Sequence, residues 1–62
     1  MPVVIIKMGA GRTVAQKKTL IAEFTKTLTD TLGVPPEMVT ILIEELPKEH
    51  IGKAGRPLSD GP

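Results

Sequence analysis

The chain opens with apolar positions that show no helical spacing and then changes to a helical period. Residues 3–8 are mostly β-branched and are bounded by Pro2 and Gly9, which predicts a strand whose apolar side chains are buried on both faces. From residue 14 onward the apolar positions follow the spacing of a helix buried along one side. Its apolar stripe consists of Leu20, Ile21, Phe24, Leu28 and Leu32.

Local signals define the ends of this helix, which is expected to cover residues 14–32. Thr13 and Gln16 match a capping box, in which the two side chains satisfy unpaired backbone N–H groups at the helix start. Gly33 is suited to the left-handed conformation that commonly follows a helix. The Pro35-Pro36 pair then prevents the helix from continuing.

A second strand is expected over residues 39–43, extending as far as Leu46 before Pro47. A strand, a long helix and a strand in this order predict parallel strands joined by a right-handed crossover. Residues 48–62 are rich in Gly, Pro and charge and are expected to form loop with a short hairpin near residues 51–55. The predicted fold class is α+β, with one domain over residues 1–62: a single β-α-β unit plus a short C-terminal hairpin, assembling through sheets between subunits.

The composition favours an oligomer. A chain of 62 residues buries only about 60% of its unfolded surface on folding. It also has no cysteine to form a disulfide, and Phe24 is its only aromatic residue. One helix covers only one face of a two-stranded sheet, yet both strands are apolar on both faces. We therefore expect several copies of the chain to cover each other's second face.

Several functional classes are disfavoured. A net charge of +1 with no aromatic platform argues against nucleic-acid binding, and the longest apolar run is too short to span a bilayer. The N-terminus lacks the features of a signal peptide, so a cytoplasmic location is expected. His50 is the only histidine and has no neighbours at a recognised ligand spacing, so a metal site is not expected. Gly9 and Gly11 lack the further features of a phosphate-binding turn.

Two residues carry candidate chemistry. Pro2 follows Met1 directly. Removal of Met1 would leave a secondary amine at the end of a buried strand, where it is a candidate base or nucleophile. Alternatively, Pro2 simply begins the strand. Arg12 precedes the helix start, where anions are favoured, and could hold a carboxylate; alternatively, it is an ordinary surface residue. The Lys17-Lys18 pair is interpreted as solvated, and Glu44 and Glu45 should point to opposite faces of their strand.

Taken in order, these motifs resemble the 4-oxalocrotonate tautomerase family of the tautomerase superfamily. The resemblance spans the chain through Met1-Pro2, Gly11-Arg12, Gln16-Lys17, the strand over residues 39–45, and His50-x-Gly52 leading into Gly55. It implies a homo-oligomer, expected to be a hexamer built as a trimer of dimers. It also implies a cofactor-independent isomerase, a keto–enol tautomerase acting on a small enol or dienol carboxylic acid.

The resemblance also implies roles for individual residues. Pro2 would be the general base, with the pKa of its amine lowered from about 8 toward neutrality by an apolar pocket and a nearby arginine. Arg12 would bind the substrate carboxylate, often reaching in from a neighbouring subunit. Thr40 and Ile51 would line the pocket where well-known members have a second arginine and an aromatic ring. These departures leave both a 2-hydroxymuconate-like diacid and a phenylenolpyruvate-like monoacid open as substrates, with Lys53 or Arg56 as candidates for the missing charge.

A non-enzymatic alternative remains at this point. The chain could be a non-catalytic assembly subunit or interaction module on the same fold, for instance one chain of a mixed hexamer. Retention of Met1 would favour this alternative, because an acylated Pro2 nitrogen is an amide and cannot act as a base.

Overall fold

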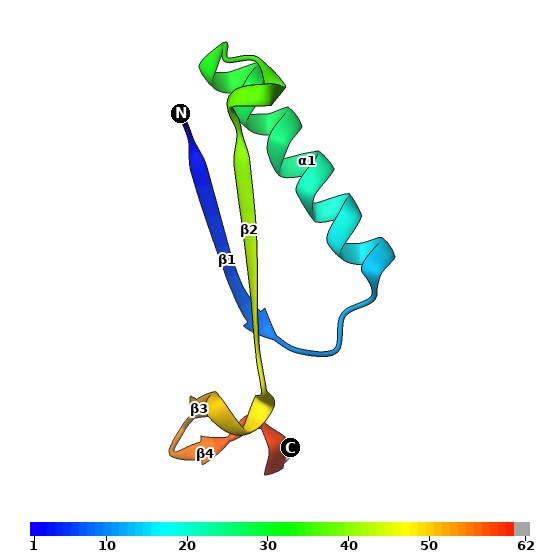
Figure 1. The fold of residues 1–62 in the computed structure, drawn as a ribbon. Coiled ribbons are helices and arrows are strands. Elements are labelled where there is room, and N and C mark those ends of the chain that lie inside the picture. Colours follow the sequence, from blue (N-terminus) through cyan, green and yellow to red (C-terminus); the bar gives the residue numbers. More distant parts are fainter. Residues whose placement is uncertain (61–62) are drawn as a thin grey trace.

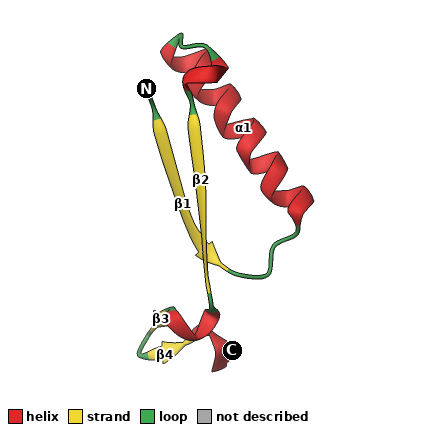
Figure 2. Cartoon of the chain, in the orientation of Figure 1, coloured by secondary structure: helices red, strands yellow, loops and turns green. Residues whose placement is uncertain are grey.

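A computed structural model describes residues 1–60 and has the expected β-α-β core with a separate C-terminal hairpin (Figures 1 and 2). Short 3-10 helices follow α1, β2 and β4. None of the helices in residues 1–60 is long and apolar enough to cross a membrane. The elements in chain order are β1 Val3–Gly9, α1 Val14–Leu32, a 3-10 helix Pro36–Met38, β2 Thr40–Leu46, a 3-10 helix Lys48–His50, β3 Gly52–Lys53, β4 Arg56–Pro57 and a 3-10 helix Leu58–Asp60.

The strands β1 and β2 are parallel, as predicted, and pair from Val3 opposite Thr40 to Gly9 opposite Leu46. The second strand begins at Thr40 rather than Val39. The Val39 N–H instead closes the preceding 3-10 turn by donating to the carbonyl of Pro36 at 3.1 Å. Because the strands are parallel, the loop after β1 and the segment after β2 leave from the same end of the sheet.

The predicted ends of α1 are confirmed. The Gln16 N–H donates to the Thr13 hydroxyl at 3.1 Å, and the Thr13 N–H donates to the Gln16 side-chain oxygen at 3.0 Å. Gly33 ends the helix in the left-handed conformation, with φ 70° and ψ 26°. This geometry fixes where the helix starts, and therefore where the residue before Thr13 can lie.

Helix α1 covers one face of the sheet and lies along β2 more than along β1 (Figure 1). The opposite face stays open within one subunit, since Val3, Ile5 and Leu42 remain 49%, 55% and 47% exposed. Burial on both faces, expected for the first strand, is therefore not achieved by a single subunit. The apolar stripe of α1 is also divided: Leu20 and Leu28 are partly covered, whereas Ile21, Phe24 and Leu32 are exposed.

The single subunit lacks a closed core, because no hydrophobic residue among residues 1–60 is fully buried. It exposes 4756 Å² of surface, whereas a compact monomer of 6.6 kDa would expose about 3,900 Å². Its radius of gyration is 14.7 Å, against about 11 Å for a compact domain of this length. The excess surface and the elongated shape agree with the prediction that other subunits complete the fold.

Adjacent glutamates on β2 bind different partners, as their alternation predicts. Glu44 lies 3.7 Å from the ammonium of Lys7 on β1, and Glu45 accepts a hydrogen bond from Lys17 on α1 at 2.5 Å. The interpretation of Lys17 as solvated was wrong, because its side chain is only 26% exposed. The Lys17–Glu45 ion pair ties the first turns of α1 to the end of β2.

The C-terminal hairpin is present, although its strands lie slightly later than predicted. Its antiparallel strands are β3 and β4, and they are joined by Ala54 and Gly55, both at positive φ (54° and 79°). The Leu58 N–H donates to the carbonyl of Ile51 at 2.9 Å. This bond returns the chain to the segment that follows β2.

Candidate functional site

Pro2 and Thr40 lie together at the beginning of the parallel sheet. Pro2 is half-buried directly before β1, and its carbonyl accepts a hydrogen bond from the Thr40 N–H at 3.1 Å. Met1 precedes the strand and is 80% exposed. The backbone of Pro2 is thus fixed by β2, while the residue attached to its nitrogen contributes little packing.

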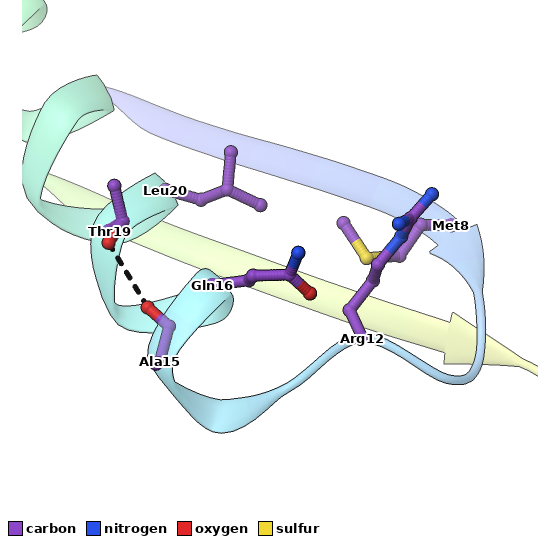
Figure 3. A pocket seen from close by; sticks show the side chains of 6 residues that line it. All are labelled: Met8, Arg12, Ala15, Gln16, Thr19 and Leu20. Atoms are coloured by element: carbon purple, nitrogen blue, oxygen red, sulfur yellow. Dashed lines mark hydrogen bonds between the residues drawn. The ribbon is translucent and has the colours of Figure 1, made fainter.

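Arg12 lies at the opposite end of the sheet, between β1 and α1. Gly11 adopts a φ of 121°, a conformation that side chains other than glycine strongly disfavour. Together with the cap at Thr13, this turn directs Arg12 to a groove of about 450 Å³ between β1 and α1. Figure 3 shows Met8 and Arg12 at the strand end of this groove, with Gln16 and Leu20 along the helix.

Arg12 also lines a second pocket of about 470 Å³ on the same end of the subunit, together with Gly9, Gly11, Lys48 and Leu58. Both volumes fall within the range of roughly 300–1,000 Å³ that is usual for small-molecule sites. Arg12 takes part in none of the ion pairs among residues 1–60. Its guanidinium is therefore available to bind an anion.

Ile51 belongs to the Arg12 end as well. A Cβ atom built on Gly9 would lie 3.6 Å from Ile51 Cδ1, so the isoleucine side chain rests near the backbone at the end of β1. The structure therefore groups the predicted site residues into two pairs. Pro2 lies with Thr40, and Arg12 lies with Ile51.

These two pairs are too far apart to form one site within a subunit. Seven residue steps along β1 separate Pro2 from Gly9, and at about 3.3 Å per step they span about 23 Å. A general base must lie within about 3.2 Å of the proton that it removes. Figure 1 shows the N-terminus at one end of β1 and the loop that leads to α1 at the other. A site that uses both Pro2 and Arg12 must therefore combine the ends of different subunits.

The charges at the two ends support such a combination. The 3-10 helix beside the Pro2 end carries Glu37, and the last turn of α1 contains no basic residue. Arg12 and Lys48 share a pocket at the other end. A carboxylate substrate at Pro2 would thus depend on a cation brought by another subunit.

Sequence reasoning did not single out Lys48, which the structure places beside Arg12. The signal was present in the topology: parallel strands end at the same edge of a sheet, so the segment after Leu46 must lie near the segment after Gly9. Lys53 and Arg56, the candidates for a replacement charge, lie on the hairpin and do not line this pocket. Among residues 1–60, no group of three His, Asp or Glu side chains is placed to hold a metal ion.

Comparison with known proteins agrees with this architecture. The family described as "Tautomerase enzyme" matches residues 2–61. The 2-hydroxymuconate tautomerase of Bacillus subtilis strain 168 is 42% identical over 60 residues, which cover 97% of each chain. The crystal structure of YwhB, a homologue of 4-oxalocrotonate tautomerase, has a TM-score of 0.89 and 39% identity, with 98% of this chain and 100% of that chain covered.

A third similar protein is the heterohexameric 4-oxalocrotonate tautomerase from Chloroflexus aurantiacus J-10-fl. One of its chains has a TM-score of 0.91 and 26% identity, with both chains covered completely. The match of family, sequence and structure extends over nearly all of the chain. The protein therefore belongs to the 4-oxalocrotonate tautomerase family of the tautomerase superfamily and is an isomerase.

Proposed function

We propose that the protein is a keto–enol tautomerase that acts on a small enol or dienol carboxylic acid, with the amine of Pro2 as general base after removal of Met1. The position of Pro2 is the observation that carries the proposal. Its carbonyl is held by Thr40, while Met1 before it is 80% exposed. Loss of Met1 would leave the amine at a fixed place without removing packed side-chain area.

The chemistry requires a neutral amine and a bound carboxylate. Apolar surroundings and the guanidinium of Arg12 from a neighbouring subunit both disfavour the ammonium form of Pro2 and so lower the pKa of its amine. The neutral amine removes the enol hydroxyl proton, and the resulting ammonium returns a proton to carbon. Arg12 holds the carboxylate through paired hydrogen bonds and orients the acid during both transfers.

The assembly that we propose is a homohexamer made of three dimers. Each dimer contact would be two-fold, so that each subunit gives the same surface to its partner. If this contact places the long axes of two subunits antiparallel, the Pro2 end of each subunit meets the Arg12 end of the other. The open face of the sheet, which includes Val3, Ile5 and Leu42, supplies apolar area for subunit contacts.

Intact mass and an ultraviolet assay test the proposal together. Mass spectrometry establishes whether Met1 is absent, and the decay of enol absorbance of phenylenolpyruvate and 2-hydroxymuconate measures ketonisation. We expect turnover of at least one acid by protein that begins at Pro2. Protein of that mass with no rate above buffer would refute the enzymatic function and would favour a non-catalytic assembly subunit.

Two substitutions separate the roles of the site residues. Replacing Pro2 with Ala should lower kcat by about 10²-fold, within the usual contribution of a positioned general base, while the hexamer persists by size-exclusion chromatography. Replacing Arg12 with Ala should chiefly raise KM, because the guanidinium binds the acid before and during reaction. An unchanged kcat in the first variant, or an unchanged KM in the second, would remove that residue from its proposed role.

A further inference from the structure

The pocket shared by Arg12 and Lys48 is cationic. Its lining residues include these two bases and no carboxylate. Lys48 begins the 3-10 helix Lys48–His50 that follows β2, and Arg12 follows the end of β1. The two cations therefore come from the two chain segments that the parallel sheet brings to one edge.

Neither cation is neutralised by a partner within the described part of the chain. Lys7, Lys17 and Lys26 each form an ion pair there, whereas Arg12 and Lys48 take part in none of these pairs. Two unpaired like charges beside one pocket repel each other and are stabilised by a bound anion. A dianion would satisfy both.

The backbone of the pocket leaves room beside Lys48. A Cβ atom on Gly9 would meet Lys48 Cγ at 3.9 Å, and one on Gly11 would meet nothing within 4 Å. The aliphatic stem of Lys48 therefore lies along the end of β1. This contact restricts where its ammonium can reach, although Lys48 as a whole is exposed.

We propose that Lys48 binds the second carboxylate of a diacid whose first carboxylate is held by Arg12, so that the enzyme prefers dicarboxylic over monocarboxylic enol acids. This inference rests on the proposed function, because the pocket becomes a reaction site only when a neighbouring subunit brings Pro2 to it. Thr40 cannot supply the charge, since its side chain carries only a hydroxyl. Lys48 supplies the positive charge from the other end of the subunit.

A matched pair of unreactive acids tests the inference without relying on turnover. trans,trans-Muconate and sorbate share one carbon skeleton, and sorbate has a methyl group in place of the second carboxylate. We expect isothermal titration calorimetry on the assembled protein to show muconate binding about tenfold more tightly than sorbate, equivalent to about 1.4 kcal/mol. Lys48→Gln should reduce this preference to less than about twofold, and Lys48→Arg should retain most of it.

Controls assign the effect to one side chain. Lys18 is exposed on α1 and outside the pocket, so Lys18→Gln should leave the preference intact, whereas Arg12→Gln should weaken binding of both acids. Equal binding of the two acids by wild-type protein, or a preference retained in Lys48→Gln, would overturn the inference. A preference lost in Lys53→Gln instead would also overturn it and would assign the second carboxylate to the hairpin.

The two proposals can fail separately. If the protein shows the Lys48-dependent preference for muconate but converts no enol acid, the proposed catalysis fails and the diacid site stands. If it converts enol acids without a preference that depends on Lys48, the catalysis stands and the role of Lys48 is refuted.

Discussion

Mixing two impaired variants should restore activity if the site is formed between subunits, when the rate is measured at a substrate concentration well below the raised KM of Arg12→Ala. One variant carries Pro2→Ala and the other Arg12→Ala, so neither alone has a complete site. Within one subunit the two residues lie beyond opposite ends of β1, and the chain covers about 23 Å from Pro2 to Gly9 alone. No small enol acid can bridge that distance, so a site that uses both residues must take Pro2 from one chain and Arg12 from another.

The expected magnitude follows from random assembly. After joint unfolding and refolding at equal concentrations, about one quarter of the equivalent sites in a symmetric oligomer should combine an intact Pro2 with an intact Arg12. The ketonisation rate should therefore reach about one quarter of the wild-type rate, above the summed residual rates of the two variants. Native mass spectrometry verifies that mixed oligomers have formed. Mixed oligomers with no gain in rate would refute a site shared between subunits.

Three further predictions concern local structure. Gly11→Ala should lower the free energy of unfolding, measured in urea, by about 1–3 kcal/mol and raise KM, because φ 121° is strained for alanine. Gly52 has open space around it and no positive φ, so Gly52→Ala should change neither quantity. Leu42→Lys should yield smaller species than wild type in light scattering, because it places a charge on the exposed sheet face. An assembly of unchanged size would contradict this. Ala54→Gly should raise the unfolding free energy by about 0.5–1 kcal/mol, since φ 54° disfavours alanine; a lower midpoint would contradict it.

The elements of the fold were predictable because each had a strong local signal. The capping box at Thr13 and Gln16 and the glycine after Leu32 marked the helix ends to the residue. The start of β2 was misplaced because Val39 is β-branched and apolar, yet its N–H is used by a turn that begins with Pro36. Hydrophobic pattern alone does not distinguish a residue that ends a turn from one that begins a strand.

The candidate site was less predictable because its distances depend on topology and assembly. Position and chemistry pointed to Pro2 and Arg12, and the family resemblance added Thr40 and Ile51. A linear pattern does not reveal that these residues form two groups at opposite ends of a strand. Lys48 was missed because a lone lysine after a proline has no distinguishing local signal. That Lys48 lies beside Arg12 can be inferred only when the two strands are known to be parallel and their register is known.

The absence of a closed core and the division of the site have a common consequence. No hydrophobic residue among residues 1–60 is fully buried within one subunit, so much of the apolar burial that stabilises the fold must occur at subunit contacts. Such contacts are also what can bring Pro2 to Arg12. Dilution that separates the subunits should therefore remove stability and activity together, whereas a site contained in one subunit would keep its activity until the subunit itself unfolded.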